Sequence, residues 1–161
     1  MPSRRDVLTS LSVAVAGGSL AGCSAFDSVS GYVHKKKITG KRRTSDGLRR
    51  ETIVSVGLRK SNNEPIMDVA ERWADRFSQP DQLHVSTALH ELLQKEYEEF
   101  SYVIGVCSED WSGGGESVGC YTAPTSRDDF NRAQVGDRVR ARYSNSTIEI
   151  HSVEGKWHPD G

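Results

Sequence analysis

The chain has 161 residues, of which 21 are Lys or Arg and 22 are Asp or Glu, so the formal net charge is −1. This balance argues against a dedicated nucleic-acid binder, and the length allows one domain with a tail rather than a two-domain enzyme. Hydrophobic residues make up 35% of the chain, which predicts a modest core. No stretch reaches the ~20 apolar residues of a membrane-spanning helix, which excludes a polytopic membrane protein.

The first residues have the build of a secretory signal. Arg4 and Arg5 precede a mildly apolar run over residues 7–15, and small residues follow. The two arginines lie in the sequence SRRDVL, which resembles a twin-arginine export signal, and the apolar run is diluted by Ser, Thr and Gly as in such signals. This resemblance implies export after folding in the cytoplasm.

A lipobox-like motif ends the small-residue stretch. Its four positions all match the lipobox of lipoproteins: Leu20, Ala21, Gly22 and Cys23. The resemblance implies cleavage before Cys23, attachment of lipid to its sulfur, and a location on the outer face of the cytoplasmic membrane. Both signals together resemble those of haloarchaeal lipoproteins. The nearly neutral net charge of the chain departs from this resemblance, because proteins of halophiles are usually more acidic. The alternative is an ordinary signal peptide in which Cys23 is only a small residue.

This division predicts a signal peptide over residues 1–22, a lipidated tether over 23–30, a single domain over 31–154 and a frayed tail over 155–161. Charge is distributed unevenly within the domain. Residues 31–60 carry ten basic and two acidic side chains, whereas residues 61–110 carry three basic and eleven acidic ones. We therefore expect these two segments to face each other or to lie side by side.

Two amphipathic helices are predicted in the middle of the domain. In residues 63–77, apolar side chains follow a period of 3.6 residues, and Pro65 lies in the permissive first turn. In residues 85–100 the same period recurs, with Ser86 as the N-cap and glutamates on the wet side.

Strand-like segments lie on both sides of these helices. They are residues 32–38, 51–58, 102–107 and 117–122, and a hairpin over residues 135–151 that turns at residues 144–146. Strands at both ends and helices between them predict an α+β domain. We expect an antiparallel sheet, or a small barrel of the OB or SH3 kind, with the two helices at its centre.

Cys107 and Cys120 are an even pair in a chain that we expect to be exported. Such a pair most simply forms a disulfide, here closing a 14-residue loop. A zinc site would need two further ligands, and free buried thiols are the third interpretation. The bond would hold Trp111 on a glycine-flanked loop, where it either contacts a partner or packs on the domain.

Basic residues cluster shortly after the tether. The cluster comprises Lys35, Lys36, Lys37, Lys41, Arg42, Arg43, Arg49 and Arg50. Beside a lipid anchor these charges could contact anionic headgroups at ~1 kcal/mol each. A solvated hairpin neutralised by the acidic segment, and binding of an acidic polymer, are the alternatives.

The sequence contains no SxxK, P-loop, GxGxxG or HExxH string. His84 and His90 are six residues apart, which does not put them on one helix face for a metal. The sequence therefore predicts no catalytic residue, no cofactor and no metal. Asn145 begins an Asn-Ser-Thr sequon at the predicted turn, so it is either a glycosylation site or a turn former.

These observations favour a lipid-anchored protein of the cell surface whose domain binds a partner or supports the envelope without catalysis. A surface hydrolase built around Asp110, Trp111 and a histidine is the alternative. A solute-binding component of a transporter is disfavoured, since such receptors need two lobes.

Overall fold

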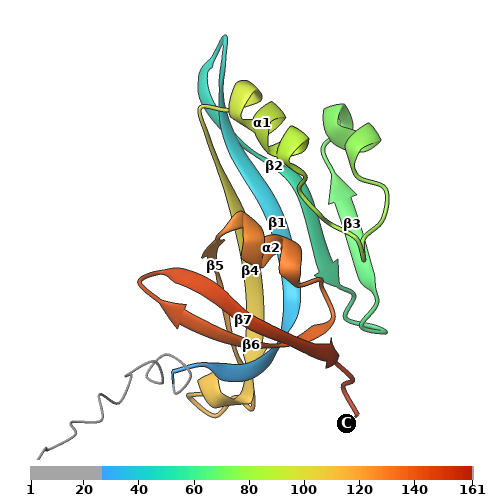
Figure 1. The fold of residues 1–161 in the computed structure, drawn as a ribbon, viewed down its shortest axis with the longest axis vertical. Helices are drawn as coiled ribbons and strands as arrows, with labels where there is room; N and C mark the ends of the chain where they lie inside the picture. The colour runs from blue at the N-terminus through green and yellow to red at the C-terminus, as the bar shows by residue number, and fades with distance from the viewer. Residues whose placement is uncertain (1–26, 161) are drawn as a thin grey trace, which may run out of the picture.

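The computed structural model describes residues 27–160, and these form a seven-stranded antiparallel sheet with short helices (Figure 1). The strands are β1 (Val29–Thr44), β2 (Gly47–Leu58), β3 (Pro65–Val69), β4 (Glu99–Ser108), β5 (Gly119–Thr125), β6 (Asp137–Ser144) and β7 (Thr147–Lys156). The helices are the 3₁₀ turns η1 (Glu71–Arg76) and η2 (Glu109–Trp111) and the α-helices α1 (Thr87–Glu96) and α2 (Arg127–Arg132). The predicted α+β class, based on an antiparallel sheet, is confirmed.

Strand β1 organises the sheet because it pairs with three other strands. Along one edge it pairs with β6 at its N-terminal end and with β2 further on, and along the other edge it pairs with β4. Strands β3 and β5 extend the sheet beyond β2 and β4, and β7 pairs with β6. The β6–β7 hairpin crosses the lower part of the sheet, while the tip of the β1–β2 hairpin projects from the opposite end (Figure 1).

The sheet curls so that its edge strands β5 and β7 approach each other. The Thr125 hydroxyl on β5 donates a hydrogen bond to the Ile148 carbonyl on β7 at 2.8 Å. Helix α2 packs between β4 and β7, and its fully buried Phe130 enters the core. The curled sheet and its helices enclose one core cluster drawn from all the major strands.

The predicted helix over residues 63–77 is wrong. Residues 65–69 form β3, which pairs with β2, and residues 71–76 form the 3₁₀ turn η1. The helical spacing persists at Trp73 and Phe77, which are buried, whereas Ile66 is 45% exposed on the strand. The backbone groups of these five residues form hydrogen bonds with the edge of β2. A helix here would leave that edge of β2 unpaired, so pairing within the sheet overrides the helical period of the local sequence.

The predicted helix over residues 85–100 is confirmed in part as α1. The Ser86 hydroxyl accepts a hydrogen bond from the Leu89 amide at 3.1 Å, as expected of an N-cap. The helix ends at Glu96, and Phe100 belongs to β4. Helix α2 has no counterpart among the predicted elements.

The hairpin predicted over residues 135–151 is present as β6 and β7. Asn145 and Ser146 form its turn with positive φ angles of 51° and 61°, a conformation that suits Asn and a two-residue hairpin. Strand β1 begins at Val29 and β7 runs to Lys156. The folded part of the chain is therefore longer at both ends than residues 31–154. Across residues 27–160, none of the helices has the length and apolar character needed to cross a bilayer.

Candidate functional site

The residues predicted to direct export and lipidation lie outside the described residues. They are Arg4, Arg5, Leu20, Ala21, Gly22 and Cys23. The described chain starts at Asp27, and Val29 already pairs with Ala141 of β6. The last residues of the predicted tether, 29 and 30, are therefore already part of the sheet.

Cys107 and Cys120 form a disulfide between neighbouring strands. They are directly opposite each other in the β4–β5 ladder, and their Cα atoms are 4.0 Å apart. Cys107 is buried and Cys120 is exposed. The bond closes the loop that begins with η2, and the disulfide predicted from the sequence is present.

Trp111 is half-buried at the end of η2 rather than projecting from the loop. Its ring meets Tyr121 edge to face with centroids 5.1 Å apart, and Tyr121 stacks on Tyr143 at 4.1 Å. A Cβ at position 119 would lie 1.9 Å from the Trp111 carbonyl oxygen, so Gly119 permits this close packing. Trp111 thus packs on the domain, and Tyr121 and Tyr143 are the more exposed aromatics, at 41% and 38%.

A cleft of about 390 Å³ lies beside the point where β1 begins. Its apolar wall includes Tyr32 and Trp157, whose rings stack with centroids 3.8 Å apart and planes inclined by 10°. Trp157 follows β7 directly and donates its backbone N–H to the Gly136 carbonyl at 2.8 Å. The C-terminal segment is therefore held on the domain as far as Trp157, in contrast to the frayed tail predicted for residues 155–161.

Polar side chains also line this cleft, among them Glu109, Asp110, Arg138 and His158. The Ser108 hydroxyl fixes the η2 wall, because it donates to the Ser30 carbonyl at 2.6 Å and accepts from the Asp110 amide at 3.1 Å. Carboxylates accept hydrogen bonds from hydroxyl or ammonium groups, a guanidinium donates them, and aromatic rings stack on flat ligands. The cleft thus combines the features of a binding site for a small polar ligand.

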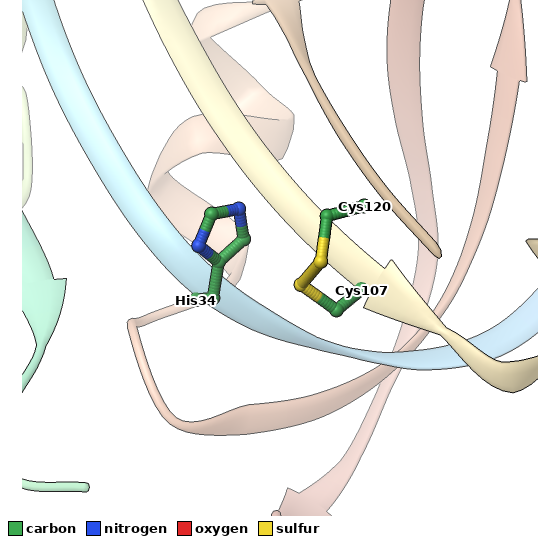
Figure 2. Close-up of side chains that lie close together, drawn as sticks. All are labelled: His34, Cys107 and Cys120. Carbon is green, nitrogen blue, oxygen red and sulfur yellow. A yellow bond between two sulfur atoms is a disulfide. The ribbon is translucent and has the colours of Figure 1, made fainter. Parts of the chain in front are cut away.

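His34 lies on β1 beside the disulfide (Figure 2). Burial, and secondly the charge of Lys35, lower the pKa of the His34 imidazole. Its Nε2 atom is buried and has no hydrogen-bond partner among the described residues. The imidazole is thus held in its neutral form near neutral pH, with a free nitrogen next to two sulfur atoms.

Lys36 is fully buried in the core. Its Nζ donates to the Leu83 carbonyl at 2.8 Å and to Gln134 Oε1 at 3.2 Å, and it lies 4.2 Å from the centre of the Phe130 ring. Desolvation lowers the pKa of Lys36 to about 7, although the charge of Asp137 opposes this effect. Lys36 therefore cannot contact lipid headgroups, and it is not part of the predicted basic surface.

The rest of the basic cluster lies on the β1–β2 hairpin, where several of its charges pair with carboxylates. Lys41 contacts Glu99 at 2.6 Å and Arg43 contacts Glu98 at 2.9 Å. Arg42 lies 3.5 Å from Glu51. The expected proximity of the basic and acidic segments is therefore present, and the hairpin alternative describes this cluster.

The length of β1 separates the charges near the hairpin tip from the end of the strand to which the predicted tether leads. Fourteen residues separate Val29 from Arg43, which is about 45 Å along an extended strand. The Debye length at physiological salt is only ~8 Å. Contact between the hairpin charges and a membrane at the tether would therefore require the domain to lie on its side.

The remaining predicted positions occupy separate parts of the fold. His90 on α1 is half-buried, and its Nδ1 lies 2.6 Å from the Tyr102 hydroxyl. His84 and His151 are exposed, and Asn145 is exposed in the hairpin turn. Asp110 and His158 line the same cleft, whereas Trp111 lies against Tyr121.

Sequence reasoning missed the Tyr32–Trp157 stack, the position of His34 and the burial of Lys36. The first pairs residues from opposite ends of the domain, for which the sequence has no local signal. The burial of Lys36 had a weak signal, because Lys36 shares the alternation of Ile38, which faces the core. No family model, no curated protein and no solved structure matches this chain.

Proposed function

We propose that this protein is exported, anchored by lipid on Cys23 to the outer face of the cytoplasmic membrane, and binds a partner in the envelope without catalysis. The observation that carries the anchoring is the run Leu20-Ala21-Gly22-Cys23 after a signal-like segment with Arg4 and Arg5. The disulfide supports an oxidising compartment, since such bonds persist outside the cytoplasm.

The cleft next to the tether is the binding site in this proposal. Ser30 and Gly31, at the start of β1, form part of its lining, so a ligand there would be held close to the membrane. The stacked rings of Tyr32 and Trp157 offer a flat apolar wall, and the carboxylates of η2 offer acceptors. This composition suits a polar ligand that carries hydroxyl groups, such as a chain of an envelope polymer.

The anchoring is tested with the full chain and its Cys23→Ser variant, expressed in a host with twin-arginine export. The wild type should fractionate with membranes and carry the mass of a lipid after loss of residues 1–22. The variant should be released or remain uncleaved, because it lacks the sulfur that accepts the lipid. Identical fractionation of both proteins with no added mass would contradict the proposal.

Binding is tested by sedimenting the Cys23→Ser protein with washed cell envelopes of the same host. Trp157→Ala should lower the bound fraction several-fold because it removes the apolar wall of the cleft. Tyr143→Ala is the matched control, since it also removes one ring of a stacked pair but lies outside the cleft. Equal binding by both variants would exclude the cleft as the binding site.

A surface hydrolase remains the second candidate, because Asp110, Glu109 and His158 line one cleft. In the same preparations, chromogenic ester and glycoside substrates distinguish the two functions. Turnover that is lost in both Asp110→Asn and His158→Gln, and kept in Glu116→Gln, would replace the binding proposal with a catalytic one.

A further inference from the structure

His34, Cys107 and Cys120 gather on one face of three adjacent strands, β1, β4 and β5 (Figure 2). Each offers one ligand atom, and the three atoms all lie within 4.8 Å of one another. Two thiolates and one imidazole are a ligand set that proteins use for zinc, with the fourth position left to water. The sequence alone suggested no third ligand, because residue 34 is more than seventy positions from Cys107.

The His34 nitrogen is poised for a ligand. Its buried Nε2 has no hydrogen-bond partner among residues 27–160, and leaving a buried polar atom unsatisfied destabilises a protein. A Cβ at position 105 would lie 2.5 Å from this atom, so the imidazole occupies space that only a glycine leaves open. Any side chain at position 105 would displace the ring from the sulfurs.

We propose that the protein with its Cys107–Cys120 disulfide reduced binds one Zn²⁺ through the two cysteine sulfurs and the His34 imidazole. The disulfide form does not bind the metal, since its two sulfurs are bonded to each other. The exposed position of Cys120 gives a reductant and the metal a route to the site.

The chemistry balances with a dithiol as the reductant. The S–S bond breaks, two electrons and two protons pass from the dithiol to the two cysteines, and the dithiol becomes a disulfide. Zn²⁺ then displaces both thiol protons into solvent and forms two Zn–S bonds and one Zn–N bond. Because two thiolates neutralise the ion, the nearby Lys35 meets no net positive charge.

The geometry allows the change from disulfide to metal. Two Zn–S bonds of ~2.3 Å at a tetrahedral angle hold the sulfurs ~3.7 Å apart. The Cα atoms of Cys107 and Cys120 are 4.0 Å apart across the ladder, so two parallel side chains would hold their sulfurs at about that separation without a shift in register.

The site acquires a role if the protein folds before export. Thiols remain reduced in the cytoplasm, so Zn²⁺ would join β4 to β5 there. Outside, exchange with a disulfide oxidant would take two electrons from the two thiolates, release Zn²⁺, leave the Cys107–Cys120 bond and convert the oxidant to its dithiol. This timing rests on the proposed function, whereas the binding itself does not.

The test uses the full-length Cys23→Ser chain, in which Cys107 and Cys120 are the remaining cysteines. Zn²⁺ is titrated against a chromophoric chelator, with the protein oxidised or reduced by a phosphine. We expect one equivalent bound by the reduced protein and none by the oxidised protein. His34→Gln should weaken binding by at least ~10-fold, and His151→Gln, at an exposed site on β7, should leave it unchanged.

A spectroscopic measurement keeps the test independent of the variant's folding. In ¹H–¹⁵N spectra of the reduced Cys23→Ser protein, Zn²⁺ should shift one ring nitrogen of His34 and leave His151 in place. Absence of binding by the reduced protein would overturn the proposal. Binding that is unaffected by His34→Gln, with no shift at His34, would also overturn it, because two thiols alone would then hold the ion.

Discussion

Replacing Lys36 with methionine should stabilise the protein by several kcal/mol below pH 7 and by much less at pH 9.5. The pKa of Lys36 falls from 10.5 in the unfolded chain to about 7 in the folded protein because the amine is desolvated. Between these two pH values the unfolded chain binds a proton that the folded protein does not. As the pH rises through this range, the free energy of unfolding of the wild type therefore increases by ~1.4 kcal/mol per pH unit. Below pH 7 both states are protonated, and the full cost of burying the charge remains.

Methionine fits this position without leaving a polar atom unpaired. The Leu83 carbonyl keeps a hydrogen bond from Gln134 Nε2 at 3.2 Å, and Gln134 Oε1 keeps one from the Leu83 amide at 3.1 Å. The thioether also suits the face of the Phe130 ring that Nζ now approaches.

Urea unfolding at pH 6.5 and 9.5 measures this effect as the difference between variant and wild type. The difference should shrink by about 3 kcal/mol between the two pH values. Lys37→Met is the control, because its side chain lies on the opposite face of β1 and is only partly buried. A stability gain that is equal at both pH values would show that the Lys36 amine does not change its charge in this range.

Reducing the disulfide should lower the free energy of unfolding by ~3 kcal/mol. Cys107 and Cys120 are 13 positions apart, and in the chain-entropy model a closed loop of this size restricts the unfolded chain by that amount. Because the unfolded chain also becomes more expanded, the dependence on urea should steepen.

The measurement compares urea curves of the Cys23→Ser protein with and without a phosphine reductant, in the presence of a chelator. A variant with alanine at both 107 and 120 should match the reduced protein and ignore the reductant. A loss below ~1 kcal/mol would mean that the β4–β5 ladder already restrains this loop in the unfolded chain. Adding Zn²⁺ in place of the chelator should restore part of the lost stability.

Segments with one consistent signal were predicted well from the sequence. In α1 the period, the Ser86 cap and the glutamates all favour a helix, and the structure has one. In residues 63–77 the apolar side chains followed the helical period equally well. However, Trp73 and Phe77 are also buried by a strand followed by a 3₁₀ turn, so their spacing does not distinguish the two structures. The need of β2 for a partner strand decided this segment, and that need is not visible in a local window.

The candidate sites show the same division between local and distant information. The disulfide follows from counting cysteines in a chain whose first residues resemble an export signal. By contrast, Trp157 and Tyr32 stack although they come from opposite ends of the domain's sequence. His34 lies close to Cys107 because β1 and β4 are neighbouring strands. Such pairs depend on strand order, which the pattern of apolar residues along the chain does not specify.

The position of β1 has a mechanical consequence for a protein held by its N-terminal end. A pull on the tether acts along β1, and the backbone hydrogen bonds of an antiparallel ladder run across that direction. Strand β1 shares ladders with β2, β4 and β6. A pull along it therefore loads many of these bonds together in shear, instead of opening them one after another. In the proposed anchored protein, the domain would be attached through the strand that has the most neighbours, and this arrangement would resist unfolding when a partner pulls on the domain.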